Sequence, residues 1–161
     1  MPSSMKKTLC NLTAHMIDLP DINVWLALVD ERHVHHVRVR HYWEQESAEK
    51  LAFCRITMLG FLRLSTQARI MDNPLSVDEA WGSYRQFLAL PLGCFLAEPL
   101  TIEVQFQALS AGSGFVHRLW TDSYLAAFAQ ASQCRLVSFD ADFMRFPGLN
   151  FLHLAPMPPQ K

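Results

Sequence analysis

Short apolar runs alternate along the chain with segments in which hydrophobic residues recur at helical spacing. The apolar runs predict five β-strands, at Ile17–Leu19, Leu51–Ile56, Cys94–Ala97, Arg135–Ser138 and Phe151–Leu154. The intervening segments predict helices, at 23–29, 33–46, 77–88, 101–109 and 121–133. Strands that alternate with helices are joined by crossovers, and crossovers make neighbouring strands parallel. The pattern therefore predicts a layered α/β fold.

Three local signals mark where helices begin. Ser76 and Glu79 form the S-x-x-E pattern of a capping box. Thr57 and Thr121 stand where N-caps are expected for the helices that follow them.

Two apolar stripes predict which helix faces are buried. After the capping box the stripe comprises Val77, Ala80, Trp81, Tyr84, Phe87 and Leu88. Its spacing favours core packing of the three aromatic rings over a base-stacking platform. In the earlier segment 33–46 the stripe comprises Val34, Val37 and Tyr42.

Composition limits the class of protein. Half of the 161 residues are hydrophobic and 18% are charged, which excludes a disordered or fibrous chain. The formal charge of −1 gives no global basic field, so nucleic-acid binding requires a local patch. Arg32, Arg38 and Arg40 are candidates for such a patch. The alternative interpretation is that these residues form a solvent-exposed helix face. The nearby His33, His35, His36 and His41 are expected to be solvated.

The cysteines and the apolar segments indicate a reduced compartment without membrane insertion. The four cysteines stand about forty residues apart with no C-x-x-C pair, so no structural zinc site is expected, and Cys54 and Cys134 are predicted to be buried thiols. The uncharged stretch 86–97 is too short for a bilayer, and residues 1–15 lack a signal-peptide core. We expect a cytoplasmic protein with an extension at 1–15, one domain at 16–155 and a tail at 156–161.

Three acids from distant parts of the chain are expected to meet. Asp21 and Asp140 each follow a predicted strand, and Asp122 lies in the first turn of a predicted helix. The carboxyl ends of parallel strands share one edge of the sheet. Converging carboxylates suit Mg²⁺ or Mn²⁺, which can activate water against a phosphodiester. Each acid alone is also explained as a turn or helix-end residue.

Four segments carry a resemblance to a known family. They are LPDINVWLALVDERHVHH, CRITMLGFLRL, WTDSYLAAFA and LVSFDADF, in this order along residues 16–154. The chain resembles PIN-domain ribonucleases of the VapC type. The resemblance implies a three-layer α/β/α sandwich with a central, mainly parallel sheet, and Mg²⁺- or Mn²⁺-dependent endoribonuclease activity that leaves a 5′-phosphate and a 3′-hydroxyl. It also implies a homodimeric toxin with an RNA substrate and a cognate antitoxin protein.

The resemblance assigns roles to individual positions. Asp21, Asp122 and Asp140 match the metal-binding and catalytic acids. Asn23 and Ser138 match small polar residues that orient those acids. Thr57 matches the hydroxyl of the second motif, and Asp142 a further acid of some members.

Met58 departs from the family pattern, which supplies a glutamate directly after the threonine. A thioether is a poor Mg²⁺ ligand and no general base. Three explanations stay open for the missing glutamate. The three remaining acids suffice to hold one metal ion, or Asp142 or Glu98 takes the place of the glutamate, or the protein is a weak or inactive nuclease. Placement of Met58 at the acidic site predicts that Met58→Glu tightens metal binding.

Two rival functions are considered. The first is a catalytically weakened PIN module that binds RNA or an antitoxin protein without cleavage, which Met58 favours and the three acids oppose. The second is a phosphatase on a similar sheet. It is disfavoured because the chain has neither paired acids after the first strand nor a Gly-rich phosphate loop.

Overall fold

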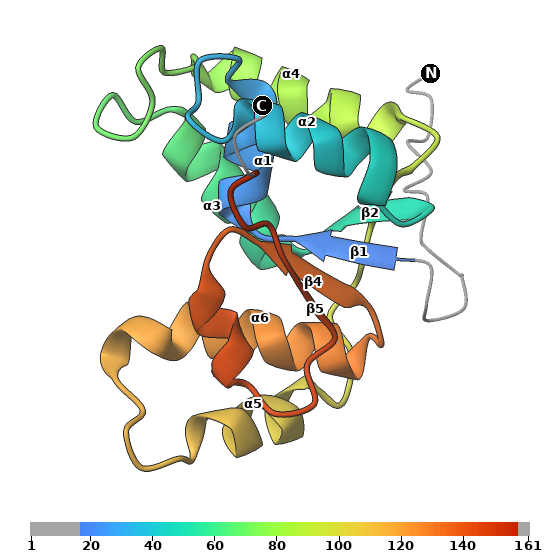
Figure 1. Cartoon of the computed structure of the whole chain (residues 1–161), viewed down its shortest axis with the longest axis vertical. Helices are drawn as coiled ribbons and strands as arrows, with labels where there is room; N and C mark the ends of the chain where they lie inside the picture. Colours follow the sequence, from blue (N-terminus) through green and yellow to red (C-terminus); the bar gives the residue numbers. More distant parts are fainter. Residues whose placement is uncertain (1–16, 158–161) are drawn as a thin grey trace, which may run out of the picture.

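One parallel sheet organises the molecule, as seen in the computed structural model, which describes residues 17–157 (Figure 1). Its strands are β1 (Ile17–Pro20), β2 (Lys50–Phe53), β3 (Gly93–Phe95), β4 (Arg135–Ser138) and β5 (Phe151–His153). Their order is β3-β2-β1-β4-β5, and every neighbouring pair is parallel. The predicted strands and their parallel arrangement are confirmed. β2 is shorter than predicted, because Arg55 already begins a helix.

Helices cover both faces of this sheet. They are α1 (Ile22–Val29), α2 (His36–His41), the π-helical turn η2 (Tyr42–Glu46), α3 (Arg55–Ser65), α4 (Val77–Ala89), α5 (Ile102–Ser110), α6 (Trp120–Ala131) and the 3₁₀ turns η3 (His117–Leu119) and η4 (Ala141–Arg145). Figure 1 shows α1 to α4 on one side of the strands and α5 and α6 on the other. The predicted three-layer sandwich is confirmed.

The strands build the two cores by simple alternation. Leu51 and Phe53 of β2 pack with α1, α3 and α4, whereas Ala52 and Cys54 pack with α5 and α6. Successive strand residues point to opposite faces, so a continuous apolar run is what a strand covered on both sides requires. Burial raises the pKa of the Cys54 thiol, which keeps it protonated.

One of the three predicted helix starts is confirmed. The Ser76 hydroxyl accepts from the Glu79 amide at 3.2 Å, and the Glu79 carboxylate accepts from the Ser76 amide at 2.7 Å. Thr57 and Thr121 are not N-caps. The caps are Cys54 and Leu119, and Thr57 instead lies at the third helical position, where its hydroxyl accepts from the Cys54 amide at 3.0 Å.

The apolar stripe predicted over 33–46 is wrong in two of its three positions. Val34 and Val37 are 85% and 74% exposed, whereas Val39 and Tyr42 are buried. The helix begins only at His36 and continues as a π-helical turn from Tyr42, so a single 3.6-residue period does not describe the segment. In α4, similarly, Ala80 and Tyr84 are buried but Val77 is exposed.

A buried ionic network fixes β1 against β4. The Asp18 carboxylate is wholly buried and accepts from Arg135 Nε at 2.8 Å and Arg135 Nη2 at 2.9 Å. It also accepts from the Tyr42 hydroxyl at 2.7 Å and the Ala48 amide at 3.0 Å. Burial, reinforced by Asp18, raises the pKa of Tyr42 far above its ordinary value, so the hydroxyl remains a donor.

The predicted domain boundaries reach beyond the described residues at both ends of the chain. The predicted extension at 1–15 lies outside the described residues, as does most of the predicted tail. Within residues 17–157, no helix is long and apolar enough to cross a membrane. The cytoplasmic location stays a prediction.

Removing the Asp18 carboxylate is expected to destabilise the fold strongly. Asp18→Ala leaves the Arg135 guanidinium partly buried without its partner, and we expect the free energy of unfolding to fall by about 3–5 kcal/mol. Urea denaturation measures this change. The exposed Asp72→Ala is the matched control and is expected to stay within about 0.5 kcal/mol of the wild type. Equal effects of the two substitutions would contradict a structural role for the network.

Candidate active site at the carboxyl edge of the sheet

The pairing of β1 with β4 brings the first and last acidic motifs together. Pro20 pairs with Val137, and the Asp21 amide continues the ladder by donating to the Val137 carbonyl at 2.8 Å. Asp21 therefore leaves β1 at the level of Ser138, the last residue of β4. Asp140 follows two residues later. Segments more than 110 residues apart in the sequence meet at one edge of the sheet.

The Ser138 hydroxyl is the centre of the site's hydrogen bonds. It is fully buried, donates to Asp21 Oδ2 at 2.9 Å, and accepts from Asn23 Nδ2 and the Asp140 amide, each at 3.0 Å. One side chain thus ties together three of the positions singled out in the sequence. The orienting roles expected for Ser138 and Asn23 agree with these contacts and remain a proposal.

Asp21 is held firmly and is hard to ionise. Its Oδ1 accepts from the Ile22 amide at 2.7 Å, which caps α1. Burial raises the pKa of Asp21 to about 6, and the negative charges of Asp122 and Asp140 add to the rise, against the lowering effect of the Ser138 and Ile22 hydrogen bonds. The pKa of this carboxyl therefore lies closer to neutral pH than that of an ordinary aspartate.

Asp122 reaches the same neighbourhood from the other helical layer. It lies in the first turn of α6, where burial and the charges of Asp140 and Asp142 raise its pKa. Arg118 and Arg145 lower it, so these two cations face the acids. Sequence reasoning missed both of them, although Arg118 stands one helical turn before Asp122.

Asp142 supports the turn that carries Asp140. The Asp142 amide donates to Asp140 Oδ1 at 2.8 Å, and its carboxylate lies 3.4 Å from Arg118 Nη1. Asp142 therefore belongs to the same cluster of charges as the three principal acids.

The donor set fits a hard divalent cation in its chemistry. It offers carboxylate oxygens. Burial, with a smaller contribution from mutual repulsion, raises the pKa values of Asp21 and Asp122, and a cation offsets that repulsion. In the described part of the chain, however, no three His, Cys, Asp or Glu side chains already stand around one point as ligands. Binding therefore requires side-chain rotation, with water completing the coordination.

The structure does not join the second motif to the acids. Thr57 is buried and hydrogen-bonded to Cys54. Met58 packs in the core beneath α4, where its Sδ lies 3.5 Å from Arg55 Nη1. Gly60 is the residue of α3 that abuts Ile22, next to Asp21, and Met58 stands about 200° away around the helix. The expectation that Met58 faces the acids is therefore wrong.

Two other expectations change with the structure. Glu98, the alternative ligand, accepts a hydrogen bond from the Tyr124 hydroxyl, and its role as a substitute stays a prediction. In the proposed basic patch, Arg38 is bound to Glu46 at 2.6 Å and Arg40 to Glu44 at 2.7 Å. These two guanidinium groups therefore have carboxylate partners, whereas Arg32 has none within residues 17–157.

One aromatic contact near the site was not anticipated. The His35 ring stacks on Phe139, between Ser138 and Asp140, with ring centres 4.3 Å apart. The Phe139 amide lies 3.5 Å from Asn23 Oδ1. The predicted solvated histidine cluster is therefore partly packed against the turn that bears the acids.

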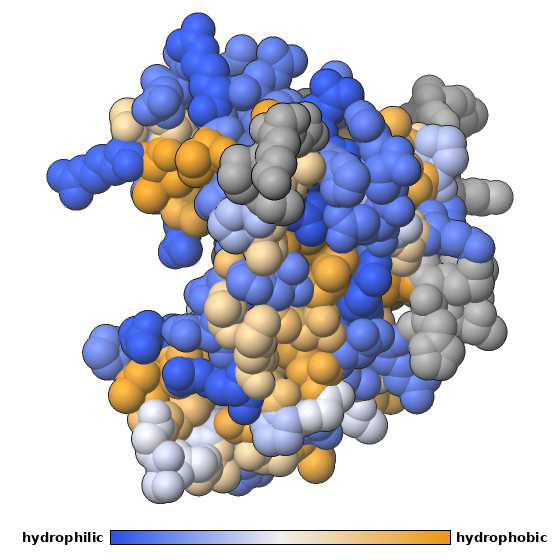
Figure 2. All heavy atoms as spheres, in the orientation of Figure 1, coloured by the Kyte–Doolittle hydropathy of each residue, from blue (hydrophilic) through white to orange (hydrophobic). Residues whose placement is uncertain are grey.

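The carboxyl edge opens on a hollow in the surface. Figure 2 shows it on the left of the view, between the helical layers above and below the sheet. This is the side toward which β1 points in Figure 1.

Comparisons with known proteins identify the arrangement. A family model described as "PIN domain" matches residues 19–149. The chain belongs to the PIN domain family. It is 35% identical over 145 residues to ribonuclease VapC41 of Mycobacterium tuberculosis, an alignment that covers 85% of this chain and 98% of that protein. The resemblance to VapC-type PIN proteins is thereby confirmed.

Solved VapC structures share the fold at low sequence identity. VapC20 of M. tuberculosis, described as a toxin that cleaves the sarcin-ricin loop, matches with a TM-score of 0.61 at 13% identity, over 80% of this chain and 95% of that one. DNA-bound VapBC from Salmonella typhimurium matches with a TM-score of 0.61 at 15% identity, over 87% and 99%. The PIN fold thus spans almost the whole of these proteins.

Met58→Glu is now expected to leave metal affinity unchanged. The new carboxylate would stand beside Arg55, on the side of α3 away from Asp21, and would pair with that guanidinium. Calorimetric titration of Mn²⁺ measures this. Gly82→Glu on α4, where the structure leaves open space, is the matched control for an added charge. Tighter Mn²⁺ binding by Met58→Glu alone would contradict the placement of Met58.

Proposed function

We propose that this PIN-domain protein is a metal-dependent endoribonuclease that acts as the toxin of a toxin–antitoxin pair. The observation that carries the proposal is the set of contacts around Ser138. These contacts join Asp21, Asn23 and Asp140, and Asp140 lies near enough to Asp122 to raise its pKa. The chain also aligns along most of its length with a protein named as a ribonuclease.

The metal we propose is Mg²⁺ or Mn²⁺, held by Asp21, Asp122 and Asp140. Bound there, it would lower the pKa of a water molecule and balance charge on the phosphodiester. The protein's own contribution is orientation. Ser138 and the Ile22 amide hold both Asp21 oxygens, and the 3₁₀ turn η4 holds Asp140.

The cations at the rim would supply contacts to the substrate backbone. Arg118 and Arg145 are exposed and lie close enough to Asp122 to lower its pKa. Arginine is suited to bidentate contact with phosphate oxygens, so these residues would position RNA beside the acids.

The partners follow from the relatives. Solved structures that share this fold include VapBC complexes, two of them bound to DNA. We propose that a cognate antitoxin protein binds this chain as well, and that the active form is a homodimer.

Purified protein freed of any partner is expected to cleave RNA only when Mg²⁺ or Mn²⁺ is added. Asp21→Asn is expected to reduce the rate at least about 100-fold, because a neutral amide would hold the proposed metal more weakly than the carboxylate. Gel analysis of the products, with end-group mapping, tests for a 5′-phosphate and a 3′-hydroxyl. RNA that stays bound in chelator without any product would support the non-cleaving binding module instead.

Metal affinity is expected to depend on pH, and the plot of log affinity against pH is expected to bend near the raised pKa of Asp21. Below pH of about 6 this carboxyl is protonated, so a proton must leave before the ion binds, and affinity falls by about tenfold per pH unit. Well above pH 6 the affinity is expected to be level. Calorimetric titrations of Mn²⁺ between pH 5 and 8 measure the profile.

Ser138→Ala provides the control for this profile. The substitution removes the hydrogen bond that lowers the pKa of Asp21, so the bend is expected to move to higher pH. A profile that stays flat in both proteins would show that Asp21 is not the group that competes with the metal.

A further inference from the structure

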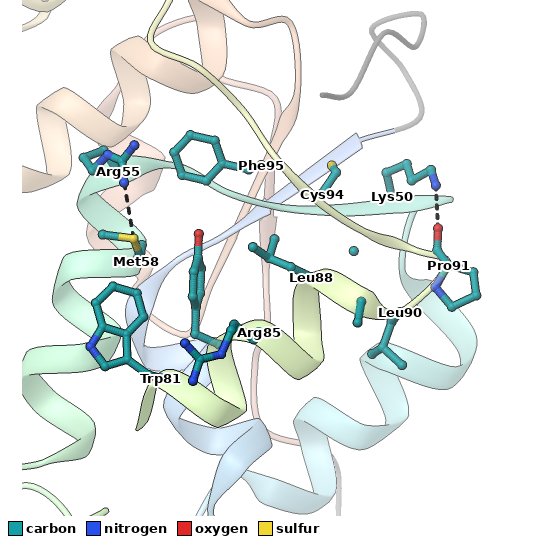
Figure 3. A pocket seen from close by; sticks show the side chains of 13 residues that line it. Lys50, Arg55, Met58, Trp81, Arg85, Leu88, Leu90, Pro91, Cys94 and Phe95 are labelled. Atoms are coloured by element: carbon teal, nitrogen blue, oxygen red, sulfur yellow. Dashed lines mark hydrogen bonds between the residues drawn. The ribbon is translucent and has the colours of Figure 1, made fainter. Parts of the chain in front are cut away.

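A second feature lies along the β3 edge of the sheet. It is a cavity of about 670 Å³ between α4, the start of α3 and the strands β2 and β3, which we call the edge cavity (Figure 3). In Figure 3, Arg55, Met58 and Trp81 lie at one end, and Lys50, Leu90 and Pro91 lie at the other. Its volume is in the range of sites that bind small molecules or single residues of a polymer.

The charges around the edge cavity all have one sign. Lys50, Arg55 and Arg85 line it, and no Asp or Glu among the described residues does. The Arg55 guanidinium lies over the Phe95 ring at 4.8 Å and near the Met58 sulfur, and neither arginine has a carboxylate partner within residues 17–157. An anionic group is therefore the kind of ligand that this lining would attract.

Aromatic faces stand between the cations. Trp81 is 39% exposed although it belongs to the apolar stripe of α4, and its ring meets that of the buried Tyr84 at 6.0 Å with an interplanar angle of 72°. An indole that is half outside the core at the mouth of a cavity offers a flat surface for stacking. Aromatic faces interspersed with unpaired arginines are the composition by which proteins bind single-stranded nucleic acids.

The position of the cavity relative to the acids favours RNA. Phe95 ends β3, Arg55 follows β2 and Asp21 follows β1, so all three lie at the carboxyl edge of adjacent parallel strands. Neighbouring strands are about 4.8 Å apart, which places the Phe95 end of the cavity about 10 Å along this edge from Asp21. An RNA strand that crosses the acids would reach it within a few nucleotides.

We propose that the edge cavity binds one nucleotide of the single-stranded RNA substrate, with its base stacked on Trp81 and its phosphate beside Arg55 and Arg85. This proposal rests on the proposed ribonuclease function. The subsite would select RNA by its sequence or shape next to the cleaved bond.

Binding of a fluorescein-labelled, mixed-sequence 12-nucleotide RNA tests the proposal, measured by anisotropy in the full chain carrying Asp21→Asn to prevent cleavage. Trp81→Ala is expected to weaken binding about tenfold, and Trp81→Phe, which keeps an aromatic face, about twofold or less. Arg55→Gln and Arg85→Gln are each expected to reduce the slope of log affinity against log salt by about 0.7. The exposed Arg69→Gln, outside the cavity, is the matched control and is expected to leave the slope unchanged.

Photo-crosslinking identifies the contact directly. RNA that contains 4-thiouridine is expected to crosslink to the α4 peptide that carries Trp81, and unlabelled RNA is expected to compete for this crosslink. Circular dichroism melting of each variant verifies that the fold is retained.

The outcomes separate the subsite from the function on which it rests. If the wild-type protein cuts RNA and the Trp81 and arginine variants bind and cut equally well, the subsite is wrong and the ribonuclease stands. If the wild-type protein neither binds nor cuts RNA, both proposals fail. Loss of a co-purifying partner protein in Trp81→Ala, with RNA affinity unchanged, would overturn the subsite and assign the cavity to that protein.

Discussion

The parallel pairing of β1 with β4 is the constraint on which the site depends. Asp21 and Ser138 are 117 positions apart in the sequence, and the register of these two strands alone brings them to 2.9 Å. The same pair of strands is tied at the opposite end by the buried Asp18 and Arg135. Asp18 therefore acts on the site through strand register, from the far end of β1.

The acids at the carboxyl edge repel one another when they are ionised, so their arrangement costs free energy unless a counter-ion is bound. Burial and mutual repulsion raise the pKa of Asp21 and of Asp122, and the opposing cations, Arg118 and Arg145, are exposed. Such perturbed carboxyl groups are concentrated at functional sites. A divalent cation would stabilise the ionised cluster, which is how the fold and the proposed chemistry are linked.

The sequence predicted the strands, the layers and the meeting of Asp21 with Asp140 well, because each rests on local periodicity and on the rule that parallel strands end together. It failed where tertiary contacts override local signals. Cys54 and Leu119 cap helices in place of Thr57 and Thr121. In segment 33–46 the helix begins only at His36 and buries Val39 and Tyr42, which leaves Val34 and Val37 exposed. The orientation of Met58 was not predictable from the order of the motifs. Met58 and Gly60 are two residues apart on α3, and two residues along a helix point in nearly opposite directions.

The central claim is that Asp21, Asp122 and Asp140 hold one divalent cation. Anomalous diffraction from a crystal soaked in Mn²⁺ tests it most directly. The account predicts a peak at the carboxyl edge of the sheet, with oxygens of Asp21 and at least one of the other two acids at about 2.2 Å, a distance typical of small divalent ions bound by oxygen. A fully occupied peak elsewhere, with this edge empty, would contradict it.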